Sequence, residues 1–403
     1  MTYREAIDWL FSTQMFGIKL GLDGPRRLLK QALAYPAHGV KVVHVAGTNG
    51  KGSTCAMVDS VARASGVRSG LFTSPHLVDF RERIRVSGEE IPEDACAAML
   101  TELRSLCESL DPHPTFFEIT LALAMQWFRE RECELIVLET GMGGRLDATT
   151  AVPADVCAIT PIGLDHTQWL GETLEEIAAE KAGIMVEGKP VICSPQEPSA
   201  RRVLEMHANE CRSPIQFVQE PLRGYPLVMA GEHQAWNAAL ALECLHALGL
   251  PLSFESVRHG LSSVQWPGRF ELVEMDGKQV IFDGAHNPPA AEALARTWRD
   301  RFGEKKPSLV FSAVATKDLG GLIAELEPLA GTIHLCPVDS GRAVPAEELA
   351  REFKGECRIH ANARDAFESA MKDEGMVLVA GSLFLIGEIK SLIKGGVWRS
   401  SEQ

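Results

Sequence analysis

The chain has 403 residues, a length that suits two domains better than one. Apolar residues make up 45% of it and charged residues 23%, proportions typical of a protein with a packed core. The formal net charge of −14 argues against general binding to nucleic acid or to a membrane surface. An anionic ligand would therefore have to be held by local features of the chain.

Ten cysteines are scattered without CxxC pairs or metal-finger spacing, which predicts reduced thiols in a cytoplasmic protein. Residues 3–11 carry charges within an apolar pattern, so we expect an amphipathic helix there and not a signal peptide. The longest apolar run, 376–387, is too short to span a bilayer. Because no coiled-coil repeat is present, a monomer is expected.

The most informative stretch is 41–54, where a β-branched apolar run leads through a glycine-rich turn into a helical pattern. Glycines let backbone N–H groups approach an anion, a helix N-terminus adds partial positive charge, and Lys51 adds a full charge. The usual phosphate-loop pattern has glycine where Val45 stands and Ser or Thr where Gly52 stands. The stretch predicts a phosphate cradle, with a simple tight turn as the alternative.

Strand and helix patterns alternate from 41 to about 195, which predicts a parallel sheet with helices on both faces. In chain order around and after the loop, the patterns predict a helix from Pro25 to 33, a helix at 55–64, strands at 68–73 and 84–87, a helix after Pro92, a helix from 116 to 131, strands at 133–139 and 156–160, and a helix that follows a cap at 173–176.

Several polar residues of this region have two readings. Glu139 ends a buried strand, where a carboxylate near a phosphate loop typically contacts Mg²⁺; an ion-paired structural glutamate is the alternative. His166 follows the next strand and is well placed to touch a metal or a phosphate. Thr115 and Glu118 have the spacing of a capping box, which favours a structural role. Lys181 lies on an alanine-rich helical pattern, where a lysine is typically solvated.

The segment 196–270 is less regular apart from a helix to 248, and its Pro-Gly turn at 267–268 predicts the boundary between domains 1–270 and 271–403. The second domain has its own α/β pattern: strands at 280–282, 309–314, 332–336 and 376–380, and helices after 288, at 319–326, at 345–353 and after 382. The predicted fold class is α/β, with a phosphate-loop, parallel-sheet ATPase domain followed by a smaller Rossmann-like α/β domain.

Seven loops, taken together and in order, resemble the folylpolyglutamate synthase/dihydrofolate synthase family, which is related to the Mur-type cell-wall ligases. The matching segments are 46–53, 73–77, 139–149, 164–167, 180–183, 267–269 and 283–288. The compact Gly-Thr-Asn-Gly-Lys turn belongs to this superfamily, so the resemblance also accounts for the irregular phosphate loop.

The resemblance implies ATP-dependent amide formation. A substrate carboxylate would attack the γ-phosphate of ATP to give an acyl phosphate, and the amine of L-glutamate would then displace phosphate. The expected acceptors are dihydropteroate, reduced folates or both. The implied cofactors are ATP and Mg²⁺ at two sites, with room for a monovalent cation. The expected partners are thus small molecules, with no nucleic acid and no membrane.

The resemblance also implies residue roles. The implied catalytic set is Lys51, Glu139, His166 and Lys181. The implied nucleotide contacts are Thr48, Asn49, Gly50, Lys51, Gly52, Ser53, Asn237, Arg269, Asp283 and His286. The implied metal set is Ser74, Glu139, His166 and Lys181, the last as an N-carboxylated lysine. The implied pteroate site lies near Ile18, Lys19, Leu20, Thr115, Phe116, Asp147 and Ala148.

Two alternatives differ from this reading in specific features. Another amino-acid ligase of the Mur superfamily would usually carry an additional N-terminal UDP-binding domain, and a phosphate loop that begins at residue 46 leaves no room for it. A phosphate-loop regulatory module would bind nucleotide without needing a second α/β domain with the loop at Asp283. Thr150 stands where bifunctional bacterial members more often have Asn, which leaves the preference for dihydropteroate open.

Overall fold

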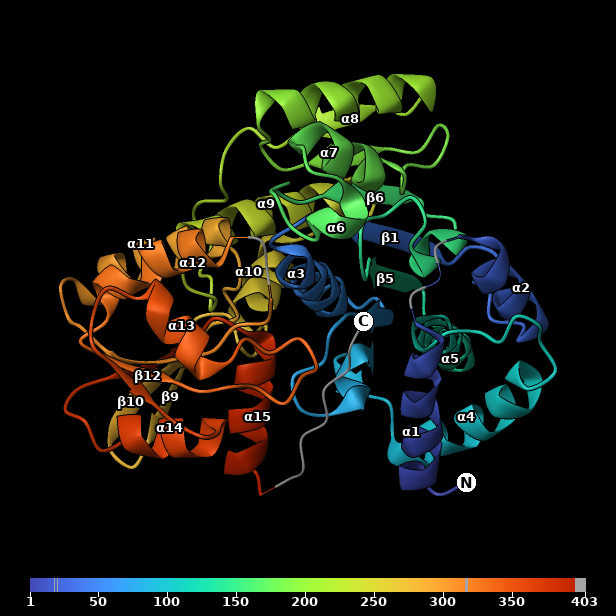
Figure 1. Cartoon of the computed structure of the whole chain (residues 1–403). Coiled ribbons are helices and arrows are strands. Elements are labelled where there is room, and N and C mark those ends of the chain that lie inside the picture. The colour runs from blue at the N-terminus through green and yellow to red at the C-terminus, as the bar shows by residue number, and fades with distance from the viewer. Residues whose placement is uncertain (18, 20, 316–317, 396–403) are drawn as a thin grey trace.

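The computed structural model describes residues 1–17, 19, 21–315 and 318–395. It contains an eight-stranded sheet of order β4-β3-β2-β5-β1-β6-β7-β8 and a six-stranded sheet of order β13-β12-β11-β14-β10-β9. Helices pack around both sheets, and the two sheets form the cores of an N-terminal and a C-terminal domain (Figure 1). The predicted α/β class with two unequal sheets is confirmed.

The elements of the N-terminal domain occupy the first two thirds of the chain. Its strands are β1 (Lys41–Ala46), β2 (Ser69–Phe72), β3 (Ile84–Val86), β4 (Glu89–Glu90), β5 (Leu135–Glu139), β6 (Val156–Ile159), β7 (Val191–Cys193) and β8 (Ile215–Phe217). Its helices are α1 (Tyr3–Ser12), α2 (Asp23–Gln31), α3 (Lys51–Ala64), α4 (Glu93–Cys107), α5 (Phe116–Glu130), α6 (Thr167–Leu170), α7 (Leu174–Ala182), α8 (Pro198–Glu210), α9 (Glu232–Ala247) and α10 (Phe254–Ser262), with 3₁₀ turns η1 (Thr13–Phe16), η2 (Phe80–Arg83) and η3 (Ala148–Ala151).

The C-terminal domain follows the same layered plan on a smaller scale. Its strands are β9 (Glu271–Met275), β10 (Lys278–Phe282), β11 (Ser308–Phe311), β12 (Thr332–Leu335), β13 (Cys357–Ile359) and β14 (Val377–Ala380). Its helices are α11 (Pro288–Phe302), α12 (Leu319–Leu326), α13 (Ala346–Glu352), α14 (Ala363–Ala370) and α15 (Leu383–Ile393), with the 3₁₀ turn η4 (Glu327–Leu329).

Strand β1 lies at the centre of the N-terminal sheet, parallel to β5 on one side and β6 on the other. Successive side chains of a strand point to opposite faces. Val42 and Ala46 accordingly join the core on the α5 side, while Val43 and Val45 join the core formed with α3 and α9. Because both faces are covered, β1 is apolar along almost its whole length and its C-terminal end is fixed firmly beneath the loop at 47–50.

Three predictions about the elements were wrong. The segment 196–270 is not irregular, because it contains α8, β8, α9 and α10; its prolines and glycines mark element ends rather than one long loop. Helices α2 and α3 begin at Asp23 and Lys51, earlier than predicted, because glycines in their first turns hid the helical pattern. Strands β9 and β13 and helix α14 were missed, since both strands are short edge strands with exposed side chains.

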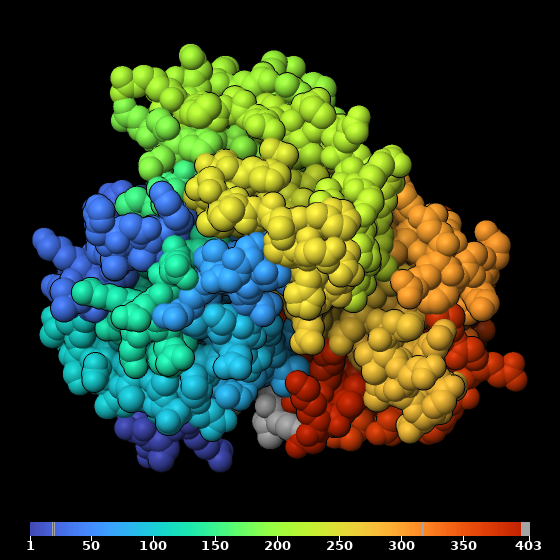
Figure 2. All heavy atoms as spheres, turned by 180° about the vertical axis from the view of Figure 1, so that it is seen from behind, coloured from blue at the N-terminus to red at the C-terminus, as the bar shows by residue number. Residues whose placement is uncertain are grey.

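The junction between the domains involves elements that are far apart in the sequence. Seen from behind, the yellow segment that contains α10 lies across the seam between the cyan and the orange-red parts (Figure 2). Leu77, from the loop after β2, is buried in the C-terminal core with Val280 and Ile386. The backbone N–H groups of Leu77 and Val78 donate to the Glu82 carboxylate at 2.7 and 3.0 Å, which holds the tip of this loop. The two domains are therefore packed together through an apolar contact as well as through covalent connection.

Among the residues that the structure describes, no helix combines the length and the apolar character needed to cross a bilayer.

Candidate active site

The turn between β1 and α3 requires glycine at two positions. Gly47 and Gly50 have φ angles of +147° and +89°, in the region that favours glycine. A Cβ atom at Gly50 would lie 2.6 Å from Oδ1 of Asn237, and one at Gly47 would overlap the Thr160 hydroxyl. The backbone of the turn thus approaches Thr160 and Asn237 too closely for a side chain at either position.

The first turn of α3 supplies an anion site. The first N–H groups of a helix, here those of Lys51, Gly52 and Ser53, have no carbonyl partner within the helix. The helix dipole adds partial positive charge at this end. The preceding amides of Thr48 and Asn49 instead donate to the Pro161 carbonyl oxygen at 3.0 and 3.4 Å, which ties the turn to the loop after β6.

Two lysines converge on this turn. Nζ of Lys51 donates to the carbonyl oxygens of Gly47 and Thr48 at 3.2 and 3.3 Å. Nζ of Lys181, on α7, donates to the same Gly47 oxygen at 2.8 Å. Burial, and then the charge of Lys51, lower the pKa of Lys181 to about 7, against the opposing charges of Asp165 and Asp147.

The solvated interpretation of Lys181 is therefore wrong. Its side chain is buried, with 4% of the residue exposed, between Ala178 and Ala182, which are fully buried. Its alanine-rich stretch of α7 packs into the core of the domain. The helix also approaches the loop after β5, since a Cβ atom at Gly144 would lie 3.0 Å from the Lys181 carbonyl oxygen. The Lys181 side chain thereby reaches Gly47 in the turn at 47–50, hereafter called the phosphate turn.

Glu139 and Ser74 meet at the ends of adjacent strands β5 and β2. The Ser74 N–H donates to Oε2 of Glu139 at 3.0 Å, and Glu139 is buried. Burial raises the pKa of the Glu139 carboxyl, while the charges of Lys51, Arg269 and Arg83 oppose that shift. Within the described residues, the Ser74 hydroxyl is buried and has no hydrogen-bond partner.

The donor set at this point suits a hard divalent cation. An unpartnered hydroxyl beside a carboxylate offers two oxygen ligands, and Mg²⁺ is typically bound by one or two carboxylates together with substrate phosphates and water. No three His, Cys, Asp or Glu side chains in the described ranges form a metal cluster. The residues present therefore fit an ion whose coordination is completed by a phosphate ligand, and not a closed protein cage.

His166 lies at the start of α6 with a left-handed backbone, φ +48°. Burial and the charges of Lys51, His286 and Lys181 lower its pKa, although the neighbouring Asp165 opposes this. Asp165 also faces the C-terminal domain, where its Oδ2 lies 3.9 Å from Nε2 of His286. The structure thus brings His166 and His286, from different domains, to within 3.9 Å of the same Asp165 carboxylate.

The other predicted nucleotide contacts lie around this junction. Both oxygens of Asp283 accept backbone N–H groups, from Phe270 at 2.8 Å and Ala285 at 2.9 Å. Burial raises the pKa of Asp283, and the charge of Arg269 opposes it. Asn237 is buried against Gly50 and donates to Oε1 of Gln234 at 3.0 Å. Asp283 therefore holds the backbone of residue 270, directly after Arg269, against the loop before α11.

The residues predicted to line a pteroate site differ in how deeply they are buried, and two of them are not described. Ile18 and Leu20 lie outside the described residues, and the exposed Lys19 donates to the His113 carbonyl at 2.8 Å. Thr115 and Glu118 form the predicted capping box, which is confirmed. The others are buried: the Phe116 ring meets Phe11 and Phe80 edge-on, and Asp147 accepts the N–H groups of Met142 and Thr149, with Ala148 beside it.

Sequence reasoning missed a buried arginine beside Glu139. Arg83 is fully buried, donates from Nε to Nδ1 of His76 at 2.8 Å and lies over the Phe116 ring. Burial lowers its pKa to about 9, and the charges of Glu139 and Glu82 oppose that shift. Its segment, 80–83, has one aromatic residue followed by three charged ones, a composition that looks like a solvated loop; the short β3 strand that follows was the only signal.

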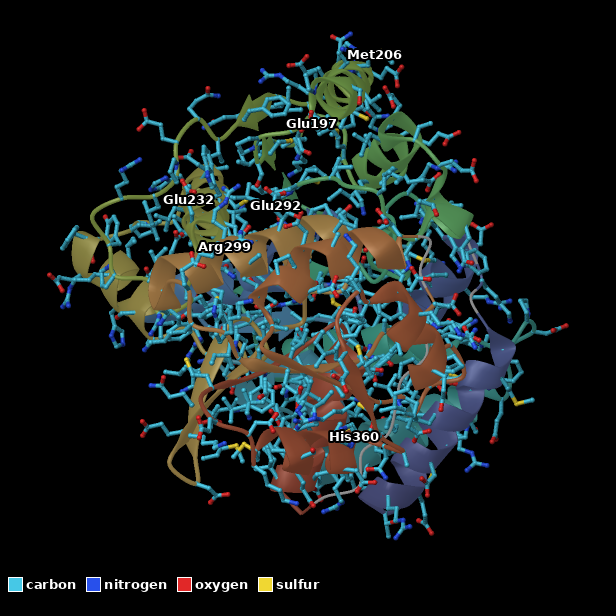
Figure 3. All side chains as sticks on the ribbon, turned by 60° about the vertical axis from the view of Figure 1, so that its left-hand side comes forward. Glu197, Met206, Glu232, Glu292, Arg299 and His360 are labelled. Atoms are coloured by element: carbon cyan, nitrogen blue, oxygen red, sulfur yellow. The ribbon has the colours of Figure 1, made fainter. Side chains whose placement is uncertain are left out.

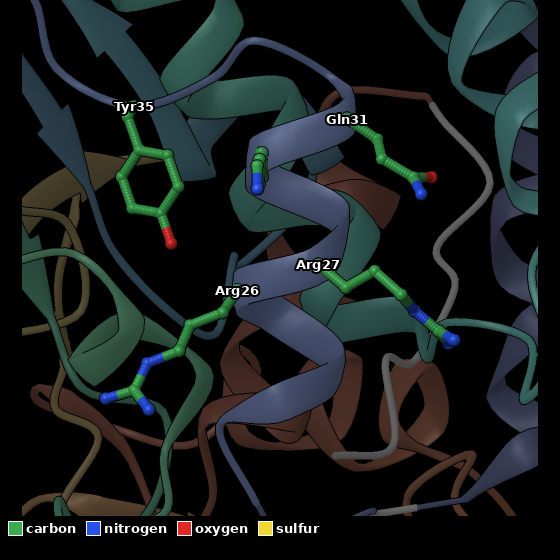
Figure 4. A pocket seen from close by; sticks show the side chains of 5 residues that line it. Arg26, Arg27, Gln31 and Tyr35 are labelled. Atoms are coloured by element: carbon green, nitrogen blue, oxygen red, sulfur yellow. The ribbon is translucent and has the colours of Figure 1, made fainter.

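A shallow hollow of about 550 Å³ on the surface of α2 is a separate feature, lined by Arg26, Arg27, Lys30, Gln31 and Tyr35. Arg27 is already engaged, since its guanidinium donates to the carbonyls of Asp111 and Pro112 at 2.7 and 3.0 Å. Arg26 and Arg27 leave the helix on opposite sides (Figure 4). The cations of the hollow diverge, so it does not compete with the phosphate turn as the candidate site.

The fold and this site define a class of protein, the ligases built from Mur ligase domains. Residues 45–220 match the Mur ligase middle domain, and residues 268–383 match the glutamate ligase domain of the Mur ligases. Both matches include the loops described above: the phosphate turn, Glu139 and His166 fall in the first, and Asp283 and His286 in the second.

More specific relatives cover the whole chain. It is 35% identical over an alignment of 428 positions to a dihydrofolate synthase/folylpolyglutamate synthase of Bacillus subtilis, covering 97% of this chain and 99% of the relative. The structure of Escherichia coli FolC in complex with DHPP and ADP matches with a TM-score of 0.87 and 34% identity, over 97% of this chain and 98% of that one.

A third relative has been solved with further ligands. A bifunctional folylpolyglutamate synthase/dihydrofolate synthase with Mn, AMPPNP and L-glutamate bound has a TM-score of 0.86 and 31% identity, over 96% of this chain and 98% of that one. The chain belongs to the folylpolyglutamate synthase/dihydrofolate synthase family.

Proposed function

We propose that this protein is an ADP-forming ligase that joins L-glutamate to dihydropteroate, to reduced folates or to both. The observation that carries the proposal is the convergence of Lys51, Lys181 and the Glu139–Ser74 pair around the phosphate turn, at the junction with the C-terminal domain. The relatives solved with ADP and DHPP, and with AMPPNP and L-glutamate, support this choice of substrates.

The reaction needs activation because a carboxylate is a poor electrophile. A carboxylate oxygen of the acceptor attacks the γ-phosphorus of ATP, the bond to the β-phosphate oxygen breaks and ADP leaves. The amine of glutamate then attacks the carbonyl carbon of the acyl phosphate, inorganic phosphate leaves and an amide remains. Phosphoryl transfer asks the protein mainly for positioning and charge neutralisation, which a rigid cationic turn supplies.

Each side chain has a role in this proposal. The first amides of α3 and Lys51 hold the phosphates, with Thr48 and Asn49 fixing the turn and Asn237 packed behind it. Arg269, on the loop shaped by Asp283, and His286 approach the nucleotide from the C-terminal domain. Lys51 gives up its two carbonyl acceptors when a phosphate offers a charged one.

The metal site in this proposal consists of Ser74, Glu139, His166 and Lys181. A divalent ion bound there supplies charge neutralisation for the phosphates when present. Glu139 and Ser74 offer oxygen ligands. Because burial lowers the pKa of Lys181 to about 7, its amine is neutral far more often than that of an ordinary lysine, and the neutral amine reacts with CO₂, with loss of a proton, to give a carbamate, an anionic oxygen ligand. Without that reaction, Lys181 stays a hydrogen-bond donor to Gly47.

The pteroate group is assigned to the region of Lys19, Thr115, Phe116, Asp147 and Ala148, together with residues 18 and 20. What supports this assignment is aromatic and polar chemistry in one place: the Phe116 ring, and the Asp147 carboxylate held by backbone amides. A pterin needs both an apolar face to stack on and hydrogen-bond partners at its edge.

We also propose the wider organisation. The domains divide at 270/271, supported by β9, which begins at Glu271 and pairs only with β10 in the described residues. The protein works as a monomer in the cytoplasm, where its ten free thiols stay reduced. Sedimentation of the purified protein tests whether it is a monomer, since a dimer would have twice the mass.

The experiment that tests the function measures phosphate release from MgATP with dihydropteroate or tetrahydrofolate, each with and without L-glutamate. Release that requires both an acceptor and glutamate, with amide product by mass spectrometry, is expected. Comparable release with a UDP-linked muropeptide and its amino acid would favour another Mur-type ligase. Release that ignores both acceptor and glutamate would favour a regulatory nucleotide-binding module.

A further inference from the structure

We infer that Asn287 is a positioning residue that fixes the phosphate turn to the C-terminal domain through Asn49. The inference rests on the proposed function in one respect, namely that the phosphate turn binds ATP. Asn287 follows His286 and precedes α11, so its role so far is that of a helix cap. Its other contacts reach two loops of the N-terminal domain.

The carboxamides of Asn49 and Asn287 form a reciprocal pair. Nδ2 of Asn49 donates to Oδ1 of Asn287 at 3.0 Å, and Nδ2 of Asn287 donates to Oδ1 of Asn49, also at 3.0 Å. Nδ2 of Asn287 also donates to Oδ2 of Asp165 at 3.3 Å, and its Oδ1 accepts the Ala290 N–H at 3.0 Å. One side chain therefore joins the phosphate turn, the loop before His166 and the start of α11.

The hydrogen-bonding capacity of Asn287 is completely used. A carboxamide has two N–H donors and an oxygen with two lone pairs. Both donors and both lone pairs have partners, and only 6% of the residue is exposed. The Ala290 N–H requires the oxygen on one side and the Asp165 carboxylate requires the nitrogen on the other, so the amide has one satisfactory orientation.

The position of Asn49 makes this pair functionally important. Asn49 immediately precedes Gly50 and Lys51, and its own N–H is bonded to Pro161. With its backbone tied on one side and its carboxamide on the other, the residue has little freedom. The orientation of the amides that follow it is then determined by where the C-terminal domain sits.

Ion pairs across the junction are longer: Asp165 lies 3.9 Å from His286, and Arg296 of α11 lies 3.7 Å from Glu232 of α9. Arg296 also pairs with Glu292 of its own helix at 3.1 Å, and the side chains of Arg296, Glu232 and Glu292 are all about 60% exposed. Glu232 and Glu292 both lie at the surface near this junction (Figure 3). Exposed ion pairs of this kind contribute little to the stability of the domain junction. The buried amide pair is the contact that specifies how the domains meet at the nucleotide site.

The test replaces Asn287 by Asp, which caps a helix as well as Asn does but has no N–H donor and faces Asp165 with a second negative charge. The matched control is Asn362→Asp, because Asn362 caps α14 of the same domain through the Asp365 N–H at 2.9 Å and lies away from the junction. Asn287→Ser, which keeps a cap but cannot reach Asn49, provides a second variant if the first fails to fold.

ADP binding by calorimetry, thermal unfolding without ligand and steady-state kinetics are measured on the full chain. For both Asn287 variants we expect the Kd for ADP and the KM for ATP to rise about tenfold or more, with the KM for the acceptor within about twofold. Asn362→Asp leaves the Kd for ADP, the KM for ATP and the KM for the acceptor unchanged. In an Asn49→Ala background, Asn287→Ser, which adds no charge beside Asp165, raises the Kd for ADP by less than about a further threefold, because its partner is already gone.

An ADP Kd within about twofold of the wild type in Asn287→Asp and Asn287→Ser would overturn the inference. The inference would also be overturned if the Kd for ADP of the double variant rose by the product of the two single-variant increases. That result would mean that Asn287 acts independently of Asn49. A wild type that binds no ADP at all would overturn the proposed function and this inference together. If the wild type binds ADP and the Asn287 variants bind it equally well, the inference alone would be overturned.

Discussion

Lys51 and Lys181 share one acceptor, the carbonyl oxygen of Gly47, at 3.2 and 2.8 Å. Two amines held that close to one another favour a neutral form of the more deeply buried one, and Lys181 is that residue. The two lysines come from helices that are far apart in the sequence, α3 and α7. Their meeting has measurable consequences for stability and for activity.

The first prediction concerns the pH dependence of stability. The pKa of Lys181 is about 7 in the folded protein and near the ordinary value of 10.5 in the unfolded chain. Between these values the unfolded state binds more protons, so burial of this amine destabilises the fold less as pH rises. We expect the free energy of unfolding of the wild type, relative to Lys181→Met, to increase from pH 7 to 10 by up to about 1.4 kcal/mol per pH unit.

Denaturant titrations of both proteins in CO₂-depleted buffer at pH 7, 8 and 9 measure that difference, and the other titrating groups cancel between them. Parallel stability curves for the wild type and Lys181→Met would mean that the amine keeps an ordinary pKa.

The second prediction concerns the carbamate. Lys181→Ala removes both the hydrogen bond to Gly47 and any carbamate, so turnover should fall by about two orders of magnitude or more. If a carbamate oxygen is the active form, added acetate or formate should restore part of the activity in a saturable manner. Absence of rescue, with nucleotide binding intact, would leave the amine itself as the active form.

The third prediction concerns the two charged side chains Lys51 and Glu139. Lys51→Ala and Glu139→Ala should each lower turnover by about 10²-fold or more while the unfolding temperature changes little, because both side chains act on developing charge. Glu139→Ala should also weaken Mn²⁺ binding in the presence of nucleotide, measured by electron paramagnetic resonance. Lys30→Ala and Glu130→Ala, both on exposed helix positions, are the matched controls and should remain active.

The fourth prediction separates backbone strain from steric overlap. Gly50 and Gly39 have nearly equal φ angles, +89° and +90°, but a Cβ atom meets Asn237 at Gly50 and open space at Gly39. Gly39→Ala should cost about 1–2 kcal/mol of unfolding free energy through strain alone and keep activity. Gly50→Ala should cost more and lose nucleotide binding.

Chemical denaturation and ADP calorimetry of both variants give the two quantities. Equal losses at the two positions would show that the approach of Asn237 to the turn has no energetic weight.

The fifth prediction concerns the apolar contact between the domains. Leu77→Ala removes a buried side chain from the C-terminal core, so it should lower the free energy of unfolding by about 2–3 kcal/mol and make the two domains melt less cooperatively. Leu33→Ala, at a residue that is 69% exposed, is the control. A single sharp calorimetric transition with unchanged midpoint in Leu77→Ala would contradict the prediction.

The sequence was most informative where a local rule decides the structure. The capping box at Thr115 and Glu118, the strand that delivers Glu139 and the helix at 319–326 all follow from short-range patterns, and the structure confirms them. The loop motifs led directly to the family. These features depend on residues that are neighbours in the chain.

Features that depend on distant neighbours could not be predicted in this way. Lys181 has the local pattern of a solvated residue, and only the packing of α7 into the core of the domain buries it. Arg83 and Leu77 lie in a loop of mixed character, and their burial depends on Phe116 and on the C-terminal core. The partners of Asn287 in the N-terminal domain are more than a hundred positions away, and no spacing rule connects them.

The burial of Leu77 has a consequence for how the protein is made. The C-terminal core that receives this side chain includes Val280, Phe282 and Ile386, all of which leave the ribosome long after Leu77 does. The loop held by Glu82 must therefore wait, with its apolar tip uncovered, until the last helix of the chain has been synthesised. During that interval Leu77, with its neighbour Val78, lacks the apolar partners that it has in the folded protein, so the order of synthesis makes the C-terminal domain the element that completes the burial of this loop.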